Sequence, residues 1–225
     1  MPRSWSELRE LAERFVGLVE TVQIDVMDGI FVPEKSWPYS EQKNDLAELV
    51  EGKDTMPFWE DIDFEADLMI ANPEEEIENW ISFGAKRIIV HIESVSDMNS
   101  VIADVKDSIN GKQATDEGRS VEFGIALNID TPNKIIAPYI HAIDFVQCMG
   151  IARIGYQGES FDERVISKIE DLREEYPDVT ISVDGGVNFE SAPKLIAAGA
   201  IRLVSGSTIL QSKDIEKAIE KLRSY

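Results

Sequence analysis

The chain has 225 residues, 43% of them hydrophobic, and its 43 acidic and 22 basic residues give a formal net charge of −21. This length and apolar content are typical of a globular domain with a large core, and they exclude a disordered chain. The charge excludes a general nucleic-acid-binding role because no basic surface is left to neutralise phosphates, and no apolar run is long enough to cross a membrane.

Helical and strand patterns alternate along the chain, beginning with an N-terminal helix that Ser4 and Glu7 open as a capping box. The strand patterns occupy residues 21–27, 63–70, 87–92, 121–129, 142–149, 179–186 and 200–207. The helical patterns occupy residues 4–20, 40–51, 72–84, 96–111, 131–139, 161–176, 188–199 and 214–224. Because no hairpin turn joins two neighbouring strands, this alternation predicts a parallel sheet with helices outside it.

These repeats predict a single domain, residues 1–225, with the α/β fold of a (β/α)8 barrel. No linker or change in composition divides the chain. The pattern contains seven strands where a closed barrel has eight, so we expect the first strand to be missing from this sequence or atypical. The N-terminus lacks the apolar segment of a secretory signal, and we expect a cytoplasmic protein.

Three residues have simple structural interpretations. Cys148 has apolar neighbours, which predicts a buried thiol in a reducing compartment. Asp28 lies in “MDG”, which predicts a turn with Asp28 as its hydrogen-bonding residue. His91 ends a strand, and we interpret it as a hydrogen-bonded histidine rather than a ligand.

The strand at residues 21–27 has a polar face that ends in a carboxylate. Period-two alternation places Gln23, Asp25 and Met27 on one face, and Asp67 takes the corresponding position on the next strand. Asp184 ends the strand in “ISVDGG” in the same way. Further candidates at strand ends are Glu93, Asn128 and Met149. Because strand ends build the active sites of parallel barrels, the carboxylates predict an acid/base pair or a site for a hard cation.

Glycines follow the last two strands. Gly185 and Gly186 come after the penultimate strand, and Gly206 and Ser207 come after the last one. In barrels these two loops often hold a phosphate on backbone N–H groups, and glycine permits the close approach. The pattern therefore predicts a phosphate site that needs no lysine.

The motifs “IDVMDGIFVP”, “LMIANPE”, “HIES”, “ALNIDTP”, “SFDERVISKI”, “VDGGVN” and “AAGAIRLVSGSTI” occur in this order. Together they resemble the successive motifs of the ribulose-phosphate 3-epimerases. The resemblance implies a (β/α)8 barrel of the ribulose-phosphate-binding type that interconverts ribulose 5-phosphate and xylulose 5-phosphate at C3 through an enediolate. It also implies Asp25 and Asp184 as the acid/base pair, a divalent metal at the enediolate, and Met27, Met69 and Met149 lining the site.

The metal site of that family is altered here. The family has His-x-Asp where this chain has Gln23-Ile24-Asp25, and its second metal histidine corresponds to Asp67. His91 matches the family's HxE motif and not a ligand position. The ligand candidates left are Asp25, Asp67 and Asp184, which favour Mg²⁺ or Mn²⁺. Zn²⁺, or no metal at all, stays an alternative.

Two further segments depart from the family. The Gly-rich loop “NPGFGGQ” corresponds to “ARIGYQGES” here, and Arg153 and Gln157 are candidates to replace its backbone contacts to phosphate. The family's first strand, with its “PSILSADF” serine, has no counterpart ahead of “PRSWSEL”.

We therefore predict a sugar-phosphate epimerase. Its partner would be a small-molecule sugar phosphate, with no nucleic acid or membrane, and a homo-oligomer is one alternative for its assembly. A second hypothesis is an enzyme that acts on another phosphorylated ketose by enolisation or aldol chemistry. A third is a non-catalytic sugar-phosphate-binding protein. The presence of Asp25 and Asp184 favours an enzyme, whereas the replacement of both histidines favours a binding protein.

Overall fold

A computed structural model describes residues 1–40, 46–52, 54–113, 121–156 and 158–225. Part of the helix expected at 40–51, residues 114–120, and Gln157 lie outside these ranges. The described chain forms two compact units, residues 1–123 and 124–225. Each unit is described separately below, and the single domain predicted from the sequence stays a prediction.

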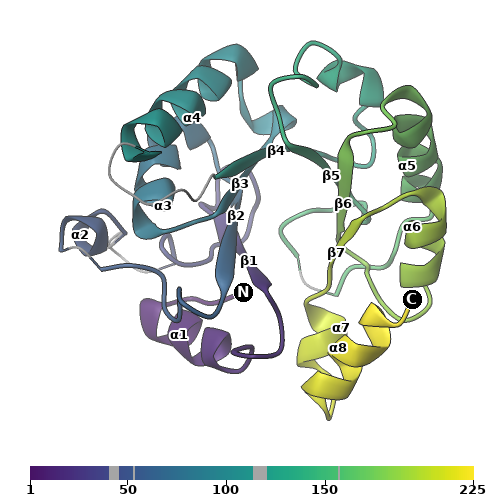
Figure 1. The fold of residues 1–225 in the computed structure, drawn as a ribbon, viewed down its shortest axis with the longest axis horizontal. Helices are drawn as coiled ribbons and strands as arrows, with labels where there is room; N and C mark the ends of the chain where they lie inside the picture. Colours follow the sequence, from purple (N-terminus) through teal and green to yellow (C-terminus); the bar gives the residue numbers. More distant parts are fainter. Residues whose placement is uncertain (41–45, 53, 114–120, 157) are drawn as a thin grey trace. The chain divides into compact units, whose positions relative to one another are not determined.

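The first unit is built on three parallel strands. β1 (Thr21–Met27) pairs with β2 (Asp63–Met69), and β2 pairs with β3 (Arg87–His91). The other elements of this unit are α1 (Trp5–Glu13), α2 (Leu46–Glu51), η1 (Pro73–Glu75), α3 (Ile77–Phe83), η2 (Ile92–Ser94) and α4 (Met98–Gln113). α3 packs against β3 and α4, so the helices cover one face of the strands (Figure 1).

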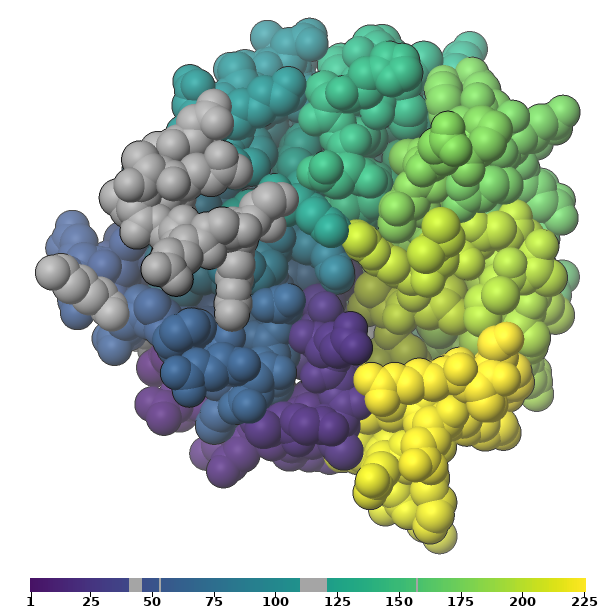
Figure 2. Space-filling view, viewed as in Figure 1, coloured from purple at the N-terminus to yellow at the C-terminus, as the bar shows by residue number. Residues whose placement is uncertain are grey.

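The second unit repeats the same arrangement. β4 (Glu122–Leu127), β5 (Phe145–Met149), β6 (Thr180–Asp184) and β7 (Arg202–Val204) pair in parallel and in chain order. The other elements are η3 (Asn133–Ile136), α5 (Arg164–Glu175), α6 (Ala192–Ala198), α7 (Ser207–Leu210) and α8 (Ile215–Arg223). α5 packs on β5, and α7 packs on α8. The C-terminal residues that include α8, drawn in yellow, lie at the surface (Figure 2).

Parallel strands in chain order, each followed by helical structure, define the (β/α)8-barrel class of fold, as the sequence predicts. The described residues contain seven strands, and helix α1 precedes the first of them. None of the described helices combines the length and the apolar character that a bilayer span requires.

Local sequence explains where several helices begin and end. Ser4 caps α1 by accepting a hydrogen bond from the backbone N–H of Glu7 at 3.2 Å. The helix ends at Glu13, seven residues earlier than the pattern predicts, and Gly17 takes a positive φ of 76° beyond it. Asp214 caps α8 at Lys217 in the same way as Ser4 caps α1. These caps satisfy N–H groups that have no partner inside the helix.

An aromatic cluster anchors the segment after β1. Trp37 has no exposed surface, and its ring lies 5.4 Å from that of Trp5 and 5.7 Å from that of Trp80. The backbone N–H of Trp37 also donates to the carbonyl of Pro2 at 2.9 Å. Burying large aromatic rings contributes several kcal/mol, about 1.5–3 for each side chain. The loop that follows β1 is therefore fixed at its far end.

Candidate active site

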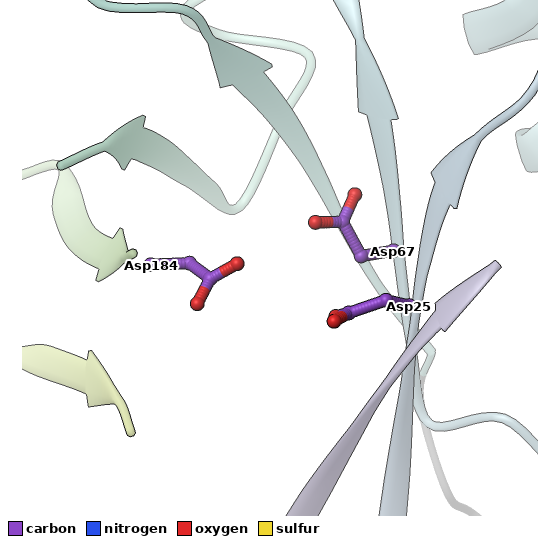
Figure 3. A group of neighbouring side chains, drawn as sticks. All are labelled: Asp25, Asp67 and Asp184. Carbon is purple, nitrogen blue, oxygen red and sulfur yellow. The ribbon is translucent and has the colours of Figure 1, made fainter. Parts of the chain in front are cut away.

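The paired strands β1 and β2 place two carboxylates side by side. Asp25 is directly opposite Asp67 in the register, and the two side chains project from their strands towards the same side (Figure 3). One carboxylate oxygen of each lies within 4.8 Å of one of the other. Asp67 is fully buried, whereas Asp25 is partly buried. The predicted common face is thus confirmed for these two residues.

Gln23 stands two residues before Asp25 on the same face. Its Nε2 donates a hydrogen bond to Oδ1 of Asp25 at 2.9 Å. Burial and, after it, the charge of Asp67 together raise the pKa of Asp25 to about 6, against the lowering by the hydrogen bond from Gln23. A carboxylate with this pKa can accept a proton near neutral pH, as a general base must.

His91 lies between two carboxylates. Its Nε2 is 3.2 Å from Oδ1 of Asp67, and its Nδ1 is 3.7 Å from Oε2 of Glu93. Burial lowers the pKa of His91, but the negative charges of Asp67 and Glu93 close to its ring outweigh this effect and raise the pKa to about 9. The interpretation of His91 as a bonded histidine did not identify these partners, since residues on different strands give no spacing signal.

Asp28 organises the turn after β1. Its Oδ1 accepts hydrogen bonds from the backbone N–H groups of Ile30 at 2.7 Å and Phe31 at 3.1 Å. Its Oδ2 accepts another from Ala71 at 2.8 Å, just beyond β2. This confirms that Asp28 is the hydrogen-bonding residue of the turn, and it shows that Asp28 also ties the turn to the neighbouring strand.

Ser36 fixes the end of β1 in a way that the sequence did not reveal. Its hydroxyl donates to the carbonyl of Asp25 at 2.6 Å and accepts from the N–H of Met27 at 2.9 Å. Its own N–H donates to the carbonyl of Met27 at 3.1 Å. Ser36 is fully buried, so the loop returns to brace the backbone of the strand that carries Asp25. A lone serine in a loop gives no periodic pattern that could have predicted this.

The three candidate methionines are buried at strand ends. Met27 is opposite Met69 in the register, next to the carboxylate pair on the same face of β1 and β2. Met149 ends β5 opposite Asp184, within the second unit. Each therefore stands where the sequence placed it, and their contact with a substrate stays a prediction.

Asp184, labelled in Figure 3, is the last residue of β6, and Gly185 and Gly186 follow it in the sequence. Gly185 and Gly186 have φ angles of 94° and 68°, a region that side chains rarely adopt. A Cβ atom on Gly186 would lie 2.7 Å from the backbone Cα of Phe161. Both the conformation and the close approach therefore require glycine at this turn.

The loop after β7 is bonded to the loop after β6. The hydroxyl of Ser205 donates to the carbonyl of Val187 at 3.0 Å, and that of Thr208 donates to the same carbonyl at 2.8 Å. A Cβ atom on Gly206 would meet no heavy atom within 4 Å, so the backbone there borders open space. These bonds bring together the two loops that carry the predicted phosphate-binding residues.

Arg153 in the altered loop is already paired. Its Nη2 lies 2.7 Å from Oε1 of Glu159, and its guanidinium lies 5.4 Å from the ring centre of Tyr156. Gln157, the other candidate of this loop, lies outside the described residues. The positive charge of Arg153 is therefore matched by a carboxylate within its own loop.

The carboxylates of the first unit suit a hard divalent cation. Asp25 and Asp67 offer only oxygen ligands, which Mg²⁺ and Mn²⁺ prefer, and no imidazole stands at the two family ligand positions. The described residues thus fit a hard cation better than a zinc site built on histidine.

A parallel α/β fold with a carboxylate pair and glycine turns at its strand ends is typical of the (β/α)8-barrel enzymes. The model of the “Ribulose-phosphate 3 epimerase family” matches residues 2–210, and the chain belongs to this family. This confirms the predicted resemblance and the prediction of a ribulose-phosphate 3-epimerase-like enzyme.

Curated relatives support the family assignment, and a solved structure supports the fold. A ribulose-phosphate 3-epimerase of Bacillus subtilis is 31% identical over 92% of this chain and 87% of that protein. One of Aquifex aeolicus is 28% identical over 98% of this chain and 90% of that protein. A crystal structure of 3-hexulose-6-phosphate synthase aligns with a TM-score of 0.63 at 21% identity, over 96% of this chain and 92% of that one. The last likeness supports the fold alone.

Proposed function

We propose that this protein interconverts ribulose 5-phosphate and xylulose 5-phosphate by moving a proton at C3. The observation that carries the proposal is Asp25, which lies two residues before the end of β1 in the motif “IDVMDG” of a chain that matches the epimerase family over residues 2–210. Gln23 and Ser36 hold this carboxylate and its backbone in place.

Epimerisation requires a base on one face of the carbon and an acid on the other. In the proposed reaction Asp25 removes the C3 proton, and Asp184 returns a proton from the opposite face of the planar enediolate. The reverse reaction exchanges the two roles. The raised pKa of Asp25 supports its role, because a base works best when its pKa lies near the working pH. Asp184 is assigned by its place in the family motif “VDGGV”.

A divalent cation would be held by Asp25, Asp67 and Asp184, with Mg²⁺ or Mn²⁺ favoured over Zn²⁺ by the oxygen ligands. When bound, it would stabilise the negative charge on the enediolate oxygens. Asp67 supplies a fully buried carboxylate next to Asp25, and Gln23 supplies an N–H to Asp25 where the family has a histidine.

The remaining contacts are assigned to the substrate's two ends. We assign Gly185, Gly186, Gly206 and Ser207 to the phosphate. The thioethers of Met27, Met69 and Met149, together with the amide of Gln23, would line the carbon chain. Flexible thioethers suit a site that accepts both epimers. We also propose a cytoplasmic protein that needs no nucleic-acid or membrane partner, given its acidic composition.

A second candidate follows from one observation, the replacement of both family histidines by Gln23 and Asp67. With the same phosphate site, the protein would then be an enzyme that acts on another ketose phosphate, or a protein that binds a sugar phosphate without catalysis. Solvent deuterium exchange separates these outcomes. In D₂O with Mg²⁺ or Mn²⁺, NMR should show deuterium entering C3 of ribulose 5-phosphate. Exchange only into another pentulose or hexulose phosphate would reassign the substrate, and binding without exchange would indicate a binding protein.

The Asp25→Asn variant provides the matched control for that experiment. It keeps the shape of the side chain and removes its basicity, so exchange should be lost while sugar-phosphate binding stays within a few-fold. Full exchange in this variant would rule out Asp25 as the base.

A further inference from the structure

His91 ends β3 and contacts Asp67, Glu93, Phe31 and Ser94. Its side chain has no exposed surface, its ring lies 5.5 Å from that of Phe31, and its carbonyl accepts a hydrogen bond from the hydroxyl of Ser94 at 2.9 Å. The ring nitrogens face two different carboxylates, Asp67 at 3.2 Å and Glu93 at 3.7 Å. The imidazole therefore has a fixed direction.

The Asp67 carboxylate needs such a partner. It is fully buried and lies opposite a second carboxylate, Asp25, with oxygens of the two within 4.8 Å. A buried carboxylate is costly unless it is paired, and two like charges repel. Nε2 of His91, 3.2 Å from Oδ1 of Asp67, offers this carboxylate a partner that offsets both effects.

The Glu93 contact explains how His91 keeps that orientation. The Glu93 side chain is 23% exposed, whereas those of His91 and Asp67 are fully buried. Glu93 therefore approaches the ring from the solvent side and leaves Nε2 directed at Asp67. Successive contacts thus connect partly exposed Glu93 through His91 to the buried Asp67.

We propose that His91 is a positioning residue that orients the Asp67 carboxylate to bind a hard divalent cation beside Asp25. Groups behind a metal ligand commonly act in this way, and their loss costs about 10–100-fold in metal affinity. The inference deepens the proposed function, on which the catalytic value of the cation rests. It concerns His91, a residue outside the family's ligand positions.

Two variants of His91 differ in which ring nitrogen they replace. In His91→Gln the amide nitrogen reaches the position of Nε2 and can still donate to Asp67. In His91→Asn the amide reaches only the position of Nδ1, on the Glu93 side. After treatment with a chelator, calorimetric titration with Mn²⁺ should show affinity about 10–100-fold weaker for His91→Asn and within a few-fold of wild type for His91→Gln. The exposed His141 provides the control, since His141→Asn should bind Mn²⁺ like wild type.

The inference is wrong if His91→Asn binds Mn²⁺ as tightly as wild type, or if both His91 variants lose affinity equally. Should either variant not fold, the wild-type protein supplies the answer by NMR. Addition of Mg²⁺ should shift the ring nitrogen signals of His91 and leave those of His141 unchanged, and an unresponsive His91 overturns the inference.

These measurements use no substrate, so they separate the inference from the proposed function. Cation binding that depends on His91, without deuterium exchange into ribulose 5-phosphate, would leave the inference standing and reject the proposed function. If deuterium exchange into ribulose 5-phosphate occurs but the cation affinity does not change in the His91 variants, the proposed function stands and the inference is wrong.

Discussion

Gln23 donates a hydrogen bond to Oδ1 of Asp25 at 2.9 Å, from the position where the epimerase family has a metal-binding histidine. The side chain that replaces the ligand thus contacts the neighbouring carboxylate directly. The same carboxylate faces Asp67, which replaces the second histidine. The substitutions therefore change the charge around Asp25 as well as the ligand set.

The first prediction concerns the pKa of Asp25, which burial and Asp67 raise to about 6 against the lowering by Gln23. In chelator-treated protein, Asp67→Asn should lower this pKa because it removes the neighbouring charge. Gln23→Leu should raise it because the carboxylate loses its donor. The pH dependence of the carboxyl carbon signal of Asp25 in NMR measures both changes.

Asp63→Asn serves as the control for these titrations, since Asp63 is an exposed residue at the other end of β2. It should leave the pKa of Asp25 unchanged. A pKa that does not respond to Asp67→Asn would mean that the two carboxylates are not electrostatically coupled.

The sequence predicted which residues of each strand share a face, because side-chain alternation along a strand is a short-range pattern. Alternation placed Asp25 and Asp67 on one face, and the structure puts them opposite each other in β1 and β2. The Ser36 and His91 contacts could not be predicted in this way. The Ser36 contacts depend on how the loop after β1 folds back, and the His91 contact depends on which side chain of β3 lies next to Asp67. Such tertiary contacts produce no repeating pattern in the sequence.

The two ends of α1 also differ in whether the sequence could predict them. The Ser4 cap of α1 was predictable because its donor, the N–H of Glu7, is three residues away. The early end of α1 at Glu13 was not predictable, since the apolar pattern continues to residue 20 while the backbone turns at Gly17. A cap can be predicted from sequence because its donor and acceptor are close in the chain. Where a helix ends can depend on tertiary packing, which the sequence pattern does not show.

The second prediction tests Ser36 as the brace of β1. Ser36→Ala removes the acceptor of the Met27 N–H and the donor to the Asp25 carbonyl, both in a fully buried place. Leaving buried polar groups unpaired should lower the free energy of unfolding by about 1–3 kcal/mol. Urea denaturation measures this loss. Ser224→Ala, at an exposed helix end, should change stability by less than about 0.5 kcal/mol.

The third prediction concerns stability at high pH. Cys148 is fully buried, and burial raises the pKa of its thiol to about 12, partly offset by the charge of Lys168. The unfolded thiol ionises near 9, the ordinary value, so between pH 9 and 12 the unfolded state binds fewer protons than the folded state. Stability should therefore fall as pH rises, with this thiol contributing a slope of about 1.4 kcal/mol per pH unit.

Cys148→Ala isolates that contribution because every other titrating group is shared with wild type. The variant should be less stable at pH 7, where it leaves a small cavity, and should lose stability less steeply above pH 9. Urea denaturation at several pH values compares the slopes. Equal slopes would show that the thiol ionises in the folded protein.

The last prediction restores the family's two imidazoles. Gln23→His together with Asp67→His would place a histidine two residues before Asp25 on the same face and another directly opposite it. Imidazole prefers Zn²⁺ over Mg²⁺, so the double variant should bind Zn²⁺ at least about tenfold more tightly than wild type, while its affinity for Mg²⁺ falls. Calorimetric titration with each ion measures both affinities, and the single variants show whether the two histidines act together. The Asp67→His change also removes the carboxylate partner of His91, so denaturation must confirm that the variant is folded. If the folded double variant binds Zn²⁺ no better than wild type, the ends of β1 and β2 do not form the cation site, and the carboxylates there serve proton transfer or structure alone.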